Sequence, residues 1–219
     1  MSVLFVTGTD TGVGKTFVTC AIASALRRRG RRIGVMKPVE TGVEREPDDA
    51  LRLRAAAGDA SSLDDVCPYR LRAPLAPDVA ARLEGVRIDL DRIVALIARR
   101  RAGVDVLLVE GAGGLLVPLV GRETLCDLAV RTALPLLIVA ANRLGTINHC
   151  ALTARVAAAA GLTVRGVVLS EPVPNPDPST ATNATAIADL TGLRVLGTLP
   201  YLMVPEEAAS AIDIDAIFR

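Results

Sequence analysis

The chain has few of the features on which nucleic-acid-binding proteins depend. It contains no tryptophan, and aromatic residues make up only 2% of its 219 residues, so few side chains could stack on bases. Its formal net charge is +1, so no excess of positive charge would attract a polyanion. We therefore expect no nucleic-acid partner.

Paired cysteines and a membrane-length apolar run are also absent. The four cysteines, at positions 20, 67, 126 and 150, form no CxxC pair, which argues against zinc and favours free thiols in a reducing cytosol. The longest dense apolar stretch, residues 133–141, has nine residues and suits a buried strand better than a membrane span. A glycine-rich turn follows the apolar residues 1–7 and no basic segment precedes them, so we expect a cytoplasmic protein without a targeting peptide.

Lysine is scarce as well, with two lysines against 23 arginines. An ammonium is a compact point charge on a flexible stem, whereas a guanidinium is wide and planar. Lys15 and Lys37 each follow a short apolar run, so these two lysines are candidate catalytic residues. Two ammonium groups at one sheet edge suggest transfer chemistry beyond simple nucleotide binding.

Strand and helix patterns alternate along the whole chain. Six short apolar runs predict strands at 2–7, 32–37, 104–109, 134–140, 164–169 and 194–199. Helical patterns lie between them at 15–29, 48–57, 89–102, 146–160 and 179–191. This alternation predicts one α/β domain over residues 1–219, with three layers and a parallel sheet flanked by helices on both faces. We expect the proline-rich residues 171–178 to form a surface loop, although a linker between domains is the alternative.

A phosphate-binding loop follows the first strand. The sequence Gly-Thr-Asp-Thr-Gly-Val-Gly-Lys-Thr (8–16) lies between a predicted strand and a predicted helix, as a P-loop requires. Lys15 would reach the β and γ phosphates, and the Thr16 hydroxyl would bind Mg²⁺. Gly8 and Gly14 enclose five residues, one more than usual. The motif indicates a fold of the P-loop NTPase type.

Two carboxylates are candidates to complete a magnesium site. Glu110 ends the strand at 104–109, where ligands collect in open α/β sheets. Asp49 lies at the start of a predicted helix, with its neighbour Asp48 as the competitor. Mg²⁺ on a triphosphate usually takes one or two carboxylates and keeps several waters. We therefore expect Thr16, Asp49 and Glu110 to surround the metal.

Four motifs together resemble the dethiobiotin synthetase family. They are the P-loop (8–16), Lys-Pro-Val-Glu-Thr-Gly (37–42), Val-Glu-Gly-Ala-Gly-Gly-Leu (109–115) and Leu-Gly-Thr-Ile-Asn-His (144–149). The resemblance implies an ATP-dependent ligase of biotin biosynthesis. Such an enzyme carboxylates 7,8-diaminononanoate with CO₂ and closes a cyclic urea through a carbamic–phosphoric anhydride, releasing ADP and phosphate.

The resemblance also implies roles for particular residues. Lys15 and Lys37 would offset charge on the carbamate and the transferring phosphoryl group, while Thr41 and Gly111 would lie near the diamine. The implied ATP-binding residues are Gly12, Val13, Gly14, Lys15, Thr16, Phe17, Asp49, Glu110, Gly111, Ala112, Gly113, Ser170, Glu171, Pro200, Tyr201 and Leu202. Ser170 stands where relatives often have an asparagine that reads adenine, so base selectivity is expected to be loose.

A homodimer is implied too. In the family, the substrate carboxylate is held by the neighbouring subunit, through the residues that correspond here to Leu144, Gly145, Thr146, Ile147 and Asn148. A helix N-terminus carrying Thr146 and Asn148 is a suitable anion site. His149, the only histidine, is expected to take no direct part in the chemistry.

Two alternatives remain at this stage. One is a related ATP-dependent amide-forming enzyme or an amidotransferase-associated synthetase, which would usually carry further domains. The other is a nucleotide-switch ATPase that positions partners or plasmids. Such ATPases commonly carry a second lysine inside the P-loop, whereas residues 8–14 contain none.

Overall fold

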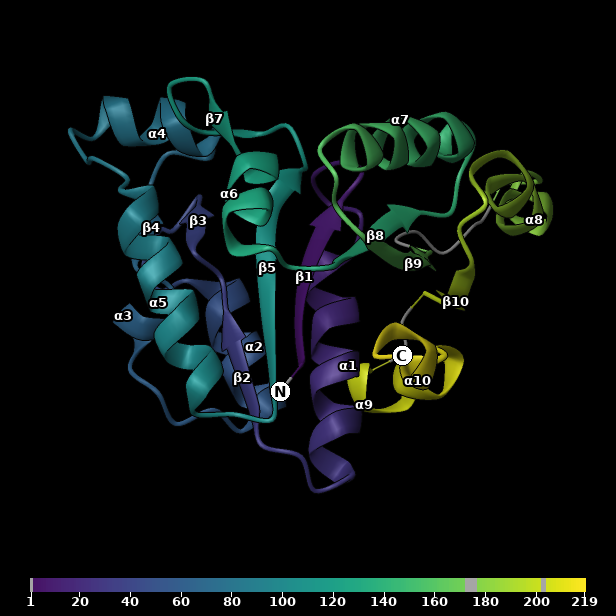
Figure 1. The fold of residues 1–219 in the computed structure, drawn as a ribbon, viewed down its shortest axis with the longest axis horizontal. Helices are drawn as coiled ribbons and strands as arrows, with labels where there is room; N and C mark the ends of the chain where they lie inside the picture. The colour runs from purple at the N-terminus through teal and green to yellow at the C-terminus, as the bar shows by residue number, and fades with distance from the viewer. Residues whose placement is uncertain (1, 172–176, 202–203) are drawn as a thin grey trace.

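A six-stranded parallel sheet forms the centre of the computed structural model, which describes residues 2–171, 177–201 and 204–219 (Figure 1). The strand order is β10-β9-β8-β1-β5-β2, and every neighbouring pair is parallel. The strands are β1 (Ser2–Gly8), β2 (Ile33–Met36), β5 (Val106–Gly114), β8 (Leu136–Ala141), β9 (Val164–Ser170) and β10 (Val195–Leu199). All six predicted strands are confirmed, but β5 continues through Gly114, so Glu110 lies inside this strand and does not end it as predicted.

The five predicted helices are also confirmed, with ends that differ by at most one residue. They are α1 (Lys15–Arg28), α2 (Asp48–Ala57), α5 (Leu90–Ala102), α7 (Thr146–Ala159) and α8 (Thr180–Thr191). Within residues 171–178, which the sequence predicts to be a surface loop, residues 172–176 lie outside the part of the chain that the structure describes.

Several short elements were not expected from the sequence. They are β3 (Val39–Thr41), α3 (Leu63–Val66), β4 (Tyr69–Leu71), α4 (Pro77–Leu83), β6 (Pro118–Val120), β7 (Glu123–Thr124), α6 (Leu125–Thr132), α9 (Pro205–Ala208), a 3₁₀ turn (Ala209–Ala211) and α10 (Ile214–Ile217). Strands β3 and β4 form a small parallel sheet, and β6 pairs with β7 in an antiparallel hairpin.

Alternate side chains of the central strands pack on opposite faces of the sheet. In β1, Leu4 and Val6 belong to the core under α1 and α2, whereas Val3 and Phe5 belong to the core under α5 and α6. The side chains under α7 and α8 form a third, smaller cluster. The sheet is therefore covered on both faces, which confirms the three-layer expectation.

Parallel strands run in the same direction, and the candidate functional residues lie at or near the carboxyl edge of the sheet. The P-loop follows β1, Lys37 follows the last residue of β2, and Glu110 lies within β5 at the same level. In the register, Val6 of β1 pairs with Glu110 of β5. The fold thus gathers residues that are about 100 positions apart in the sequence.

No helix of the described residues is both long and apolar enough to cross a membrane.

Candidate active site

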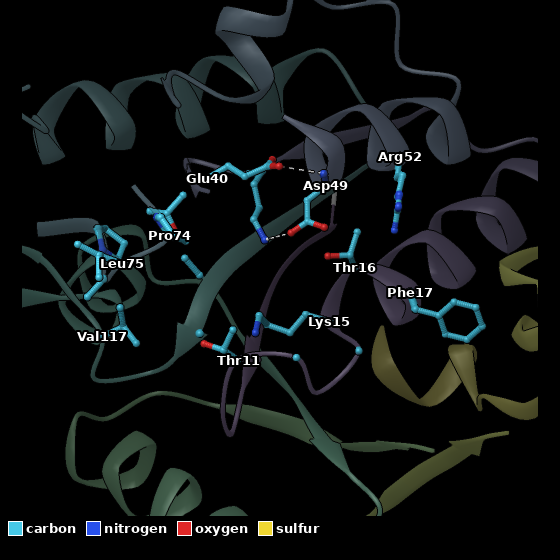
Figure 2. Close-up of a pocket in the computed structure, with 18 residues that line it drawn as sticks. Thr11, Lys15, Thr16, Phe17, Glu40, Asp49, Arg52, Pro74, Leu75 and Val117 are labelled. Carbon is cyan, nitrogen blue, oxygen red and sulfur yellow. Dashed lines mark hydrogen bonds and ion pairs between the residues drawn. The ribbon is translucent and has the colours of Figure 1, made fainter. Parts of the chain in front are cut away.

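A cavity of about 790 Å³ opens at the carboxyl edge of the sheet (Figure 2). Its lining includes predicted site residues: Gly12, Gly14, Lys15, Thr16, Phe17, Lys37, Thr41, Asp49, Ala112 and Gly113. Figure 2 shows Arg52 and Phe17 at one end of the cavity, and Pro74, Leu75 and Val117 at the other. Glu40, Arg52 and residues 74–77 also line it and were not singled out from the sequence.

The P-loop wraps one side of this cavity. Gly12 and Gly14 have φ angles of 72° and 88°, a left-handed backbone conformation that residues with a side chain rarely adopt. Lys15 is the first residue of α1, and its Nζ donates to the carbonyl oxygen of Asp10 at 3.0 Å. Burial and the neighbouring ammonium of Lys37 lower the pKa of Lys15 to about 8. This loop can therefore hold an anion with backbone N–H groups and a cation whose charge depends on pH.

Lys37 lies in a buried ion cluster at the floor of the cavity. Its Nζ donates to Oε1 of Glu110 at 2.6 Å and to Oδ2 of Asp49 at 2.9 Å. Burial alone would lower the pKa of Lys37, but the two carboxylates outweigh it and raise the pKa. Burial alone would likewise raise the pKa of Asp49, but attraction to Lys37 holds that pKa below its usual value. The cluster therefore fixes one permanent ammonium beside the P-loop.

The same cluster has the donors that a magnesium ion prefers. The Thr16 hydroxyl donates to Oε1 of Glu110 at 2.8 Å, and Asp49 approaches from α2. Glu110 is fully buried, yet its Oε2 has no hydrogen-bond partner among the described residues. No group of three or more His, Cys, Asp or Glu side chains suited to a metal occurs in the described part of the chain. Two carboxylates and a hydroxyl fit Mg²⁺ bound to a triphosphate, because that ion keeps several waters.

Ser170 lies behind the P-loop. Its side chain is buried, and its hydroxyl donates to the carbonyl oxygen of Val13 at 2.6 Å. A Cβ atom on Gly14 would come within 2.7 Å of the Ser170 Oγ, so the loop and the serine are closely packed. This contact braces the phosphate loop, a role that sequence reasoning missed because Val13 and Ser170 are 157 residues apart.

The other residues expected near the base follow the paired ends of β9 and β10, where the backbone N–H of Glu171 donates to the carbonyl oxygen of Leu199 at 2.9 Å. Glu171 lies beside Asn142, whose amide nitrogen donates to Oε1 of Glu171 at 3.5 Å. Pro200 and Tyr201 are exposed. Leu202 lies outside the described residues. A separate cavity of about 530 Å³, lined mainly by apolar side chains, shares Thr16, Phe17 and Arg52 with the main one.

The segment expected to hold a carboxylate is not part of the main cavity. Gly145 and Leu144 precede α7, and the Leu144 side chain is 80% exposed. Ile147 and Asn148 line a different cavity of about 360 Å³. Thr146, the first residue of α7, is buried. Within one chain, therefore, residues 144–148 line no part of the main cavity, although the neighbouring Arg143 forms an ion pair with Asp10 of the P-loop at 4.0 Å. Gly111 lies closer, since its carbonyl oxygen accepts from Lys37 Nζ at 3.4 Å.

All four cysteines are buried and none forms a disulfide, as expected from the sequence.

Comparison with known proteins adds a family to this geometry. Residues 2–208 match the family model described as "AAA domain". The chain is 51% identical over 203 residues to the ATP-dependent dethiobiotin synthetase BioD of Anaeromyxobacter dehalogenans (strain 2CP-C), covering 90% of this chain and 89% of the relative. Relatives of the same name in Thermodesulfovibrio yellowstonii and Bacillus subtilis are 38% and 39% identical, over 97% and 90% of this chain and 97% and 87% of the relatives.

Solved structures that resemble the chain show the fold alone. The MinC:MinD cell division protein complex of Aquifex aeolicus matches with a TM-score of 0.60 and 17% identity, covering 99% of this chain and 94% of that one. Chloroplast FtsY of Physcomitrella patens matches with a TM-score of 0.54 and 18% identity. The match covers 100% of this chain and 65% of the FtsY chain. Both support the α/β fold described above, in which the P-loop connects β1 to α1.

Proposed function

This chain belongs to the ATP-dependent dethiobiotin synthetase family, and from that premise we propose how its sheet-edge cavity carries out the family's reaction. The protein is an ATP-dependent ligase of biotin biosynthesis. It joins CO₂ to 7,8-diaminononanoate and closes a cyclic urea, and ATP is converted to ADP and phosphate.

The chemistry proceeds in three steps. The 7-amino group takes up CO₂ and loses a proton to become a carbamate. A carbamate oxygen then attacks the γ-phosphorus of ATP, the bond to the ADP oxygen breaks, and a carbamic–phosphoric anhydride forms. Finally the neutral 8-amino nitrogen attacks the carbonyl carbon and loses a proton as the carbon–nitrogen bond forms, and the carbon–oxygen bond to phosphate breaks so that phosphate leaves. Negative charge is present on both reacting groups, so fixed cations in the site lower the barrier.

We assign the role of these fixed cations to Lys37 and Lys15. The single observation that carries the assignment is the buried cluster in which Glu110 and Asp49 hold the Lys37 ammonium at 2.6 and 2.9 Å. A cation held in this way is oriented before substrate arrives, so little reorganisation accompanies the reaction. Lys15, at the start of α1, faces the same cavity and would contact the β and γ phosphates.

Thr16, Asp49 and Glu110 would hold Mg²⁺, and the unpartnered Oε2 of Glu110 supports this assignment. When bound, the ion neutralises charge on the triphosphate oxygens. Thr41, Ala112 and Gly113 line the same cavity as Lys37, and we propose that they lie near the diamine.

For the base, we propose contacts from Glu171 and from Pro200–Tyr201. Because the Ser170 hydroxyl is engaged with the carbonyl of Val13, it offers no amide-like pair of contacts to adenine. Discrimination among ATP, CTP and GTP should therefore be weak, below about 100-fold.

We also propose a homodimer in which residues 144–148 of one chain complete the site of the other. The absence of residues 144–148 from the lining of the P-loop cavity in their own chain supports the idea. So do the exposed side chains of Leu116 and Leu152, which line one cavity together with Thr11 of the P-loop. The absence of disulfides among the four cysteines supports a reducing, cytoplasmic location. We treat residues 1–219 as one domain.

The reaction is tested by mixing the protein with the diamine, bicarbonate, ATP and Mg²⁺ and detecting dethiobiotin by mass. The Lys37→Ala variant should yield little product, and wild-type turnover in it would overturn the catalytic assignment.

The metal ligands are tested by magnesium titration of turnover. Glu110→Gln and Asp49→Asn should both raise the magnesium requirement. The matched control is Asp48→Asn, because Asp48 is exposed and adjacent to Asp49 in the same helix turn. An unchanged requirement in both site variants would mean that the ligands lie elsewhere.

A further inference from the structure

The first turn of α2 is held by a side chain from another element. This turn carries Asp49, and the residue before the helix is Pro47, whose side chain has no atom that could accept a hydrogen bond. Glu40 of β3 supplies the acceptors instead. Its Oε1 accepts from the backbone N–H of Asp49 at 3.0 Å, and its Oε2 accepts from the N–H of Ala50 at 3.0 Å. Figure 2 shows Glu40 beside Asp49 at the edge of the cavity.

Glu40 is itself firmly placed. It is 8% exposed, and its strand β3 pairs with β4 in a register that sets Glu40 opposite Arg70. Three residues earlier, the backbone N–H of Lys37 donates to the carbonyl of Val66 at 2.8 Å. The short segment 37–40 therefore carries both the central ammonium and the carboxylate that holds α2.

Two links consequently join this segment to Asp49. The ammonium of Lys37 contacts the Asp49 side chain, and the carboxylate of Glu40 contacts the Asp49 backbone. A side chain alone can rotate among its rotamers, whereas a fixed backbone N–H sets where the side chain begins. With both links present, the Asp49 carboxylate has one position relative to Lys37.

We propose that Glu40 is a positioning residue that acts through Asp49: its carboxylate fixes the first turn of α2 so that Asp49 is oriented for the metal and for Lys37. Both Glu40 oxygens are used by backbone N–H groups, so its contribution to the reaction passes through the helix. The proposal rests on the metal role assigned to Asp49 above.

The test compares the magnesium requirement of three variants at saturating ATP and diamine. Glu40→Ala should raise the Mg²⁺ concentration for half-maximal turnover about tenfold, the size that loss of a helix cap typically gives. Glu40→Gln keeps one accepting oxygen, so it should raise the Mg²⁺ concentration for half-maximal turnover by a smaller factor. If Glu40→Ala does not fold, the result for Glu40→Gln tests the proposal in its place.

A matched control separates positioning from stability. Asp89 caps α5 in a comparable way, because its Oδ1 accepts from the backbone N–H of Arg92 at 3.1 Å, and it does not line the cavity. Asp89→Ala should lower the melting temperature to a similar extent and leave the magnesium requirement unchanged. Equal requirements in Glu40→Ala and Asp89→Ala would overturn the proposal.

A double-mutant cycle distinguishes this proposal from the one on which it rests. If Glu40 acts through Asp49, the magnesium shifts of Glu40→Ala and Asp49→Asn will not add in the double variant. A shift in Asp49→Asn without one in Glu40→Ala refutes the positioning role alone. A shift in Glu40→Ala without one in Asp49→Asn refutes the route through Asp49. No shift in either variant refutes both the positioning role and the metal role of Asp49.

Discussion

Nucleotide binding to this protein should take up a proton at alkaline pH. In the protein without nucleotide or metal, burial and the nearby charge of Lys37 lower the pKa of Lys15 from its ordinary value of 10.5 to about 8. A bound triphosphate places negative charge beside the ammonium and favours the protonated form, so the pKa should return to about its ordinary value. Binding above pH 8 therefore requires that Lys15 regain its proton.

The magnitude follows from the two pKa values. With a free pKa of about 8, Lys15 is about 10% deprotonated at pH 7, half deprotonated at pH 8 and about 90% deprotonated at pH 9. Binding should thus take up about 0.1, 0.5 and 0.9 proton at these pH values, and affinity should approach a tenfold fall for each pH unit above 8. The raised pKa of Lys37 keeps that group protonated throughout this range.

Isothermal titration calorimetry in buffers of different ionisation enthalpy measures this proton uptake. The matched control is Lys15→Arg, because a guanidinium stays protonated over the whole range and should show no uptake. Readings at pH 8 and above are the decisive ones, since the terminal phosphate of ATP is already ionised there. Uptake that is absent at pH 9, or equal in the wild type and Lys15→Arg, would refute the reasoning.

The same pKa shift also affects folding. Nucleotide affinity should fall as the pH rises above 8, whereas the stability of the nucleotide-free protein should rise. Lys15 binds its proton less tightly in the folded protein than in the unfolded chain, so it lowers the free energy of unfolding at neutral pH. This cost is fully present below pH 8 and disappears as the pH rises from 8 toward 10.5. Lys15→Met should therefore stabilise the nucleotide-free protein at pH 7, by up to about 3 kcal/mol in urea unfolding.

Three further outcomes are expected. Lys37→Ala should lower the free energy of unfolding by about 3 kcal/mol in urea titration, because it removes the main counter-charge of the fully buried Glu110; a loss below about 0.5 kcal/mol would contradict this. Ser170→Ala should weaken ATP and CTP about equally, by roughly fivefold, since it removes the hydrogen bond to Val13; a change in the ratio of the two affinities would show a base contact instead. Mixing the inactive variants Lys37→Ala and Asn148→Ala should restore about one quarter of the sites if they are shared across a dimer, and no recovery after verified subunit exchange would exclude sharing.

Elements of regular pattern were predictable from the sequence alone. The six central strands are apolar on both faces, and the five long helices lie between them, so local pattern is sufficient to identify them. The small elements were missed because each is short and depends on its neighbours. Helix α6 is an example. It begins at a capping box between Thr124 and Asp127, with aspartate where glutamate or glutamine is usual.

The P-loop was predictable for the same reason, because its glycines, Lys15 and Thr16 are contiguous in the sequence. The choice between Asp48 and Asp49 was not, since adjacent helical residues point about 100° apart and only the docking of α2 determines which one faces the cavity. Asp49 meets Lys37, whereas Asp48 is exposed.

Tertiary structure also decided how the charged residues work together. Lys37 and Glu110 are 73 residues apart, and their contact exists because β2 and β5 pair in parallel with Met36 opposite Val109, which brings the next residue of each side by side. The Glu40 contact with α2 depends likewise on the placement of β3. Local sequence specifies which residues can carry charge, but strand pairing and burial determine which charges meet and how strongly they interact, because electrostatic energy depends on distance and on exclusion of water.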